Sequence, residues 1–157
     1  IVSRDWSSDV CSSDLFSLST KMSLSQVFKW NTVVDFADTD AGGVVYNARY
    51  LEWTERARAS WFRDCKLSNQ YLWQQGIVFA VSRAEIDFKR PAQLDDYIRV
   101  DTTVNNVRPV RLIVSHNIYR KDDDNLLCAC NVTLACLDHR KKKPIKIPIS
   151  ILNQLIS

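Results

Sequence analysis

The chain has 157 residues, a formal net charge of +3 and a hydrophobic fraction of 46%. A chain of this length can form one domain with a hydrophobic core, but it is too short to form two such domains readily. Because the positive charges are spread out except at Arg140 to Lys143, they favour an anionic small ligand and argue against a nucleic-acid-binding surface.

No window approaches the roughly 20 apolar residues that a membrane-spanning helix needs. His and Cys pairs do not occur at the spacings of zinc sites, and the cysteines after residue 21 lie mostly in an apolar run. These are Cys65, Cys128, Cys130 and Cys136. We therefore expect free thiols in a reducing, cytoplasmic compartment, with neither a metal nor a cofactor.

Residues 1–21 differ from the rest of the chain, since they are rich in Ser and Asp and have no periodicity. The run D5-W-S-S-D-V-C-S-S-D-L15 resembles the translation of a sequencing-adapter oligonucleotide. We expect a segment that is not native to the protein, with a disordered leader as the alternative. It lacks the basic start and apolar centre of a signal peptide. The expected single domain covers residues 22–157.

Along that domain, the first predicted strand covers residues 27–36, which are rich in β-branched and aromatic residues. Between residues 47 and 65, apolar side chains recur every three or four positions, which predicts a long helix that buries Trp53, Ala57 and Trp61. A short helix over 68–75 should end at Gly76. Four strands are predicted over 77–88, 98–107, 110–119 and 126–137, and a terminal helix over 147–156. This order predicts an α+β domain whose antiparallel sheet of about five strands wraps around the long helix.

The stretch D38-T-D-A-G-G-V-V-Y-N-A-R-Y50 holds two of the three glycines, just before the long helix. Glycine accepts positive φ and close approach of other atoms, and the first N–H groups of a helix have no partner within it. Such N–H groups stabilise a negative oxygen like that of an acyl-transfer transition state. A carboxylate from Asp38 or Asp40 could face the same substrate carbonyl. In the alternative reading, these carboxylates shape the turn and Asn47 is the helix N-cap.

The run D38-T-D-A-G-G-V-V-Y-N-A-R-Y-L-E-W-T-E-R-A-R58 resembles the signature of hotdog-fold acyl-CoA thioesterases of the 4-hydroxybenzoyl-CoA type, especially their Tol-Pal-associated branch. The stretch F88-K-R-P-A-Q-L-D-D96 is also similar to that branch, and the likeness spans about Phe28 to Leu137. It implies a hotdog fold and hydrolysis of an acyl-CoA substrate. It also implies a homodimer or homotetramer with active sites at the subunit interface.

By this resemblance, Asp40 would be the nucleophile or the general base, and the backbone N–H of Asn47, next to Tyr46, would hold the oxyanion. Gly42 and Gly43 would let the loop turn toward the substrate. Arg108 matches a position near the coenzyme A phosphates, and Lys89 and Arg90 are further candidates for that contact. The branch usually has His in place of Asn47, so any role of an imidazole there is absent. Some relatives have basic residues where this chain has Pro109 and Val110.

Other readings differ in the carrier or in the reaction. One alternative is a thioesterase that acts on acyl carrier protein, since the positive net charge suits an acidic carrier. Another is a non-catalytic protein that binds acyl-CoA or is a partner in an envelope complex. A dehydratase is disfavoured because its loop His is missing. Some hotdog enzymes place their catalytic carboxylate on the long helix, but Glu55, next to Arg56, is expected to have a structural role. His116 and His139 are expected to be sheet residues. The run Asp122 to Asn125 is expected to be a hairpin turn and not a metal site.

Overall fold

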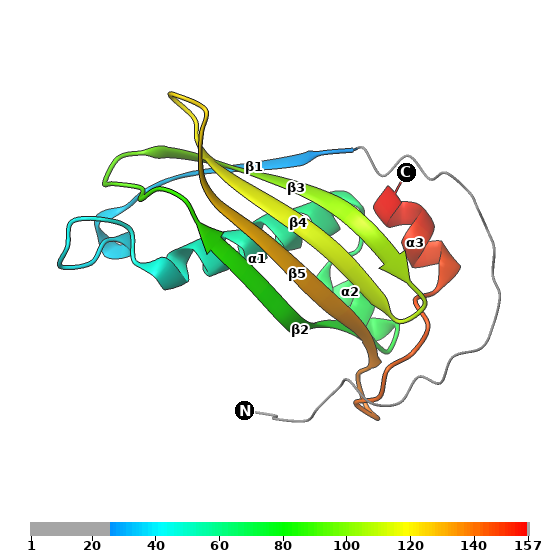
Figure 1. Cartoon of the computed structure of the whole chain (residues 1–157). Helices are drawn as coiled ribbons and strands as arrows, with labels where there is room; N and C mark the ends of the chain where they lie inside the picture. The colour runs from blue at the N-terminus through cyan, green and yellow to red at the C-terminus, as the bar shows by residue number, and fades with distance from the viewer. Residues whose placement is uncertain (1–25, 157) are drawn as a thin grey trace.

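The protein is described by a computed structural model over residues 26–156, so the predictions for residues 1–21 lie outside the described residues. One antiparallel sheet with the strand order β1-β3-β4-β5-β2 curves around the long helix α1 (Figure 1). The strands are β1 (Phe28–Val33), β2 (Ile77–Phe88), β3 (Tyr97–Arg108), β4 (Arg111–Arg120) and β5 (Asn125–Asp138). The helices are η1 (Phe36–Asp38), α1 (Asn47–Asp64), α2 (Asn69–Gln74) and α3 (Ile149–Ile156).

Helix α1 packs on the concave face of the sheet through one apolar stripe. Its buried residues include Tyr50, Trp53, Ala57 and Trp61, which recur at the three- and four-residue spacing of a helix face. Buried residues alternate along β3 and β4, and β5 has a continuous buried run from Leu134 to Leu137. The predicted α+β architecture and the predicted contribution of α1 to the core are confirmed.

The four later strands begin and end within one residue of their predicted bounds. Strand β1 ends at Val33 and not at residue 36, because the next residues turn into η1, where the Asp35 N–H donates to the Asp38 carboxylate at 3.0 Å. Residues 121–124 form the predicted turn between β4 and β5. The prediction for His139 is wrong, since it lies in the turn after β5 and not in the sheet.

Strand β2 forms one edge of the sheet and β1 the other. Strand β2 pairs with β5 along its whole length, from Ile77 opposite Asp138 to Phe88 opposite Cys128. Its other side has no strand neighbour among residues 26–156, and most of its side chains from Val81 onward are exposed. A long open edge of this kind is a template for pairing with another strand.

No helix in the described part of the chain is both long enough and apolar enough to span a membrane.

Candidate active site

The loop that joins η1 to α1 is closed by its own backbone. Thr39 and Val45 form an isolated antiparallel bridge. Inside this bridge the Asp40 N–H donates to the Val44 carbonyl at 2.9 Å, and the Gly43 N–H donates to the Asp40 carbonyl at 3.0 Å. The Asp40 side chain joins the same turn, because its Oδ1 accepts a hydrogen bond of 2.7 Å from the Gly42 N–H. The backbone thus fixes one carboxylate oxygen of Asp40, while its Oδ2 has no hydrogen-bond partner among the described residues.

The two glycines of this loop are needed for different reasons. Gly43 has a φ of +74°, a conformation that L-residues rarely adopt, although a Cβ added there would have no heavy atom within 4 Å. A Cβ added to Gly42 would lie 3.0 Å from Asp40 Oδ1, closer than nearly all real Cβ contacts. Gly43 therefore provides the bend, and Gly42 provides the space that the Asp40 carboxylate occupies.

Two hydrogen bonds attach the loop to the segment that follows β2. The Val45 N–H donates to the Ala92 carbonyl at 2.9 Å, and the Ala92 N–H donates to the Tyr50 hydroxyl at 2.9 Å. Ala92 and Tyr50 are both buried. The motif at residues 38–58 and the motif at 88–96 therefore meet in space, with Tyr50 as the link between them. This role of Tyr50 was not predicted from the sequence. The signal that could have indicated it is that a buried Tyr hydroxyl needs a hydrogen-bond partner.

Helix α1 begins beside this loop. Tyr46, and not Asn47, is the N-cap residue, and it makes no side-chain capping bond, so the alternative reading of Asn47 as the N-cap is wrong. The start of α1 is held by Asp38, whose carbonyl accepts from the Tyr46 N–H at 2.9 Å and whose carboxylate lies 3.4 Å from Arg49. The Asn47 N–H has no acceptor among the described residues. It is thus a free donor at the positive end of an 18-residue helix.

Asp40, Gly42, Gly43, Tyr46 and Asn47 are all exposed and lie on one loop and helix start. Lys89 and Arg90 lie at the same end of the sheet, because both of their N–H groups donate to the Leu127 carbonyl next to the Ala92 segment. Their side chains are engaged locally, with Asp87 and Asn125 respectively.

Arg108 is at the far end of the sheet from the Asp40 loop (Figure 1). The loop follows β1, and the last residue of β1, Val33, pairs with Tyr97 at the start of β3. Arg108 is the last residue of β3. With about 3.3 Å per residue along a strand, roughly 35 Å separates these two ends of β3. A single subunit therefore does not bring Arg108 and Asp40 together.

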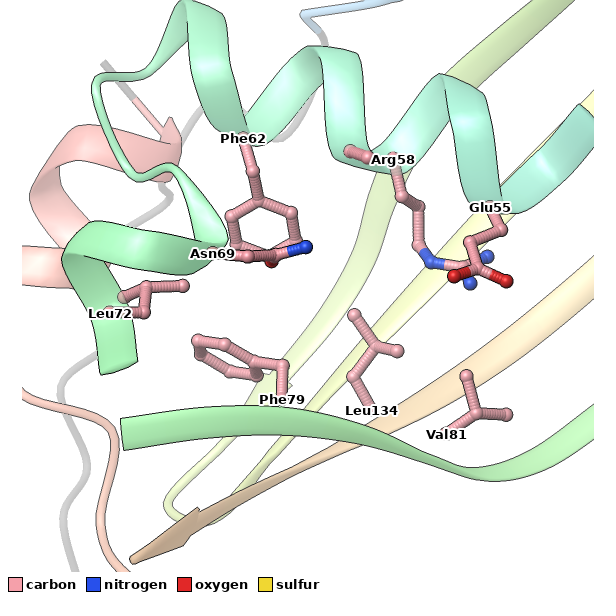
Figure 2. Close-up of a pocket in the computed structure, with 9 residues that line it drawn as sticks. Glu55, Arg58, Phe62, Asn69, Leu72, Phe79, Val81 and Leu134 are labelled. Carbon is pink, nitrogen blue, oxygen red and sulfur yellow. The ribbon is translucent and has the colours of Figure 1, made fainter. Parts of the chain in front are cut away.

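A cavity of about 240 Å³ lies between α1, α2, β2 and β5. Its walls combine the apolar Phe62, Leu72, Phe79, Val81 and Leu134 with the polar Glu55, Arg58 and Asn69 (Figure 2). Glu55 forms no ion pair within 4.0 Å among the described residues. It lies on the wall of this cavity with Arg58, and its charge offsets part of the lowering of the Arg58 pKa by burial.

Arg58, on the wall of this cavity, contacts a buried histidine. Its Nη1 lies 3.3 Å from His116 Nε2 and 3.4 Å from Thr54 Oγ1, and His116 Nδ1 lies 2.9 Å from Thr102 Oγ1. Burial, followed by the charge of Arg58, lowers the pKa of His116 to about 3, so the imidazole is neutral at pH 7. Nε2 then accepts from Arg58 and Nδ1–H donates to Thr102. His116 is a sheet residue, as predicted, but its partnership with Arg58 was not predicted.

Cysteines 65, 128, 130 and 136 are free, and the last three are buried. Burial raises the pKa of Cys128 to about 12 and that of Cys136 to about 11, so both are inert as nucleophiles. Within residues 26–156, no group of three His, Cys, Asp or Glu side chains could hold a metal ion.

Comparison with known proteins gives a consistent picture. Residues 34–155 match the family model of the thioesterase-like superfamily. The chain is 35% identical over 126 residues to the acyl-CoA thioester hydrolase YbgC of Escherichia coli, covering 80% of this chain and 93% of that protein. It is 36% identical to the acyl-CoA thioesterase YbgC of Haemophilus influenzae, with 80% and 91% covered. The crystal structure of a 1,4-dihydroxy-2-naphthoyl-CoA thioesterase from Synechocystis superposes with a TM-score of 0.77 at 26% identity, covering 83% of this chain and 96% of that one. These findings confirm the predicted hotdog fold.

Proposed function

Since the chain belongs to the thioesterase-like superfamily, we propose that it hydrolyses acyl-CoA thioesters to a free acid and coenzyme A at the Asp40 loop. The observation that carries this proposal is the pairing of a fixed carboxylate with a free helix N–H. Asp40 is held through Oδ1 by Gly42, and the Asn47 N–H at the start of α1 has no acceptor among the described residues.

In the proposed reaction, the thioester carbonyl oxygen accepts a hydrogen bond from the Asn47 N–H. As negative charge develops on that oxygen, this donor and the positive end of α1 stabilise it; one such donor typically contributes roughly 3 kcal/mol. Asp40 Oδ2 either attacks the carbonyl carbon and releases the coenzyme A thiolate, leaving an acyl-Asp40 anhydride that water then hydrolyses to the free acid, or takes a proton from the water that attacks the carbonyl carbon directly. The Asn47 side chain has no titratable group, so Asp40 is the proposed acid–base group of the loop.

The proposed activity is tested with Asp40→Asn, which keeps the shape of the side chain and removes its charge. Release of free thiol from acyl-CoA esters should fall by orders of magnitude, with an unchanged thermal unfolding midpoint. Asp122→Asn is the matched control, because Asp122 lies in the exposed turn between β4 and β5 and should retain full turnover. Equal turnover of the Asp40→Asn variant and the wild type would contradict the assignment.

We further propose that the enzyme is a homodimer or homotetramer in which β2 pairs with β2 of a second subunit. The open edge of β2 supports this pairing. In a two-fold antiparallel pairing centred near Ala84, Arg83 of one strand would face Glu85 of the other. The same axis would carry the far end of the second sheet, with its Arg108, toward the Asp40 loop of the first. Arg108 would then reach the coenzyme A phosphates from across the interface.

Subunit mixing tests this arrangement. Asp40→Asn removes the carboxylate of a site and Arg108→Gln removes its cross-subunit arginine, so each homodimer should be impaired at low substrate concentration. A mixed dimer would hold one site with both native residues, and activity should therefore rise when the two variants are unfolded, mixed and refolded together. An activity that stays at the average of the two parents would contradict the interface site.

The thiol carrier is proposed to be coenzyme A, and the compartment the reducing cytoplasm, in keeping with the free thiols of the described residues. The same acyl group supplied on coenzyme A and on acyl carrier protein should be hydrolysed faster from coenzyme A. A faster reaction with the carrier protein would instead identify the acidic protein as the partner.

A further inference from the structure

Arg58 is a buried cation that forms no ion pair among the described residues. The residue is only 7% exposed, and no carboxylate lies within 4.0 Å of its guanidinium in the described part of the chain. Burial lowers its pKa, and the charge of Glu55 offsets only part of that effect. A buried charge without a close counter-charge is costly, and a ligand carboxylate would lower that cost.

The free donors of Arg58 reach the cavity. Both of its hydrogen bonds within the protein use Nη1, so Nε and Nη2 have no acceptor among the described residues. Among the described residues, His139 Nδ1 is the only side-chain nitrogen or oxygen that is both fully buried and without a hydrogen-bond partner. Since Nε and Nη2 of Arg58 also have no partner, they are not fully buried and are accessible from the cavity. Arg58 lines the 240 Å³ cavity, and Figure 2 shows its side chain extending from α1 toward the strands.

The cavity lies on the same stripe of α1 as the proposed oxyanion donor. Counting from Asn47, steps of four, four and three residues lead through Leu51 and Glu55 to Arg58, and all lie on one helix face. Arg58 is about 16 Å farther along the helix axis than Asn47, and its side chain leans back toward the N-terminus. Leu51, 41% exposed, is an apolar surface between them.

Resting on the proposed function, we propose that Arg58 selects acyl-CoA substrates whose acyl group ends in a carboxylate. The thioester carbonyl lies at Asn47, methylene groups lie over Leu51, and the terminal carboxylate accepts hydrogen bonds from Nε and Nη2 of Arg58. These two donors form the planar fork that fits a carboxylate in two-point contact. The substrate class is the mono-coenzyme A thioester of a medium-length dicarboxylic acid.

His116 and Glu55 have opposite parts in this recognition. His116 occupies Nη1 as a neutral acceptor and leaves the other side of the guanidinium free for the ligand. Glu55, on the same cavity wall and exposed, repels an incoming carboxylate and limits the affinity. Removal of its charge should therefore strengthen the preference for carboxylate-ended substrates, an effect that a purely structural role of Arg58 does not predict.

The test compares kcat/KM for pairs of thioesters of equal chain length, one ending in a carboxylate and one in a methyl group, over acyl chains of about four to ten carbons. A charge-assisted two-point contact corresponds to at least about a tenfold preference for the carboxylate at the best length. Arg58→Met should reverse that preference, and Arg58→Lys, which keeps the charge without the fork, should give an intermediate value. Arg56→Met, a variant at an exposed position on another face of α1, should keep the wild-type ratio.

The outcomes separate this inference from the proposed function. If no thioester of either series is hydrolysed, the proposed function fails. If methyl-ended thioesters are hydrolysed as well as or better than their carboxylate-ended partners at every length, the Arg58 inference fails and the activity stands. If Arg58→Met does not fold, Glu55→Gln decides the question, because it should raise the carboxylate-to-methyl ratio severalfold; an unchanged or lower ratio overturns the inference.

Discussion

Replacing Gly43 with alanine should lower the stability of the protein, whereas replacing Gly42 with alanine should lower its turnover. In Gly43→Ala, the new Cβ meets no atom within 4 Å, but the φ of +74° costs an L-residue about 1–2 kcal/mol. For a domain of this size, that loss lowers the thermal midpoint by about 3–8 °C. In Gly42→Ala, the Cβ would lie 3.0 Å from Asp40 Oδ1. The carboxylate must then move, and its 2.7 Å bond from the Gly42 N–H lengthens or breaks.

Because Asp40 is exposed, water replaces that bond, so Gly42→Ala should barely change the thermal midpoint. Its turnover should nevertheless fall by about ten- to a hundredfold, since a displacement of less than 1 Å at a reacting group has effects of this size. The assay is thiol release at saturating acyl-CoA, combined with thermal unfolding of both variants. A Gly42→Ala variant with full kcat would refute the reasoning, because it would show that the position of Asp40 does not limit the reaction.

Three further predictions concern the support of the site, the buried histidine and the start of the helix. Tyr50→Phe leaves the buried Ala92 N–H without its acceptor and should lower the free energy of unfolding, measured in urea, by about 1–3 kcal/mol. Turnover should fall as well, because the Val45 N–H of the Asp40 loop donates to the carbonyl of the same Ala92. The pKa of His116 is about 3 when folded and about 6.5 when unfolded, so the unfolded state binds more protons between these values. The free energy of unfolding should therefore fall by up to about 1.4 kcal/mol per pH unit as the pH drops from 6.5 toward 3. The measurement is the urea midpoint of unfolding at pH 7.5 and at pH 5, and the difference between the two midpoints should be smaller in His116→Gln than in the wild type. Arg49→Gln removes the contact of 3.4 Å with Asp38. It should reduce turnover more than stability, because both side chains are partly exposed. A loss of stability without a loss of turnover would contradict the role of Arg49 in holding the start of α1.

Periodicity predicted the helix and the four later strands because burial on one face repeats with the pitch of each element. Strand β2 kept its predicted bounds of residues 77 and 88, since Gly76 at φ +78° and Pro91 limit it on both sides. Strand β1 was overextended, because apolar residues continue through a segment that a carboxylate, Asp38, turns into η1. A side-chain bond to the backbone leaves no periodic signal, so it was not predicted.

The candidate site was predictable only as far as it is local in sequence. Asp40, the glycines and the helix start lie within one motif, and the resemblance of that motif to a known family suggested their roles. The hydrogen bond from Ala92 to Tyr50 and the contact of Arg58 with His116 join residues distant in the chain, and they depend on how the sheet curves over α1. Asn47 is the first residue of α1 and not its N-cap, one position from the alternative reading, because the backbone is still extended at Tyr46.

Strand β2 also has a consequence for synthesis of the chain. Its only strand partner among residues 26–156 is β5, which begins at Asn125, so β2 leaves the ribosome well before the strand that pairs with it. During that interval both of its edges are open to other nascent chains. The charges of Arg83, Glu85 and Asp87 interrupt its apolar residues and oppose aggregation at this stage. Replacing them with neutral residues should therefore reduce the soluble yield in cells more than it reduces the stability of the purified protein.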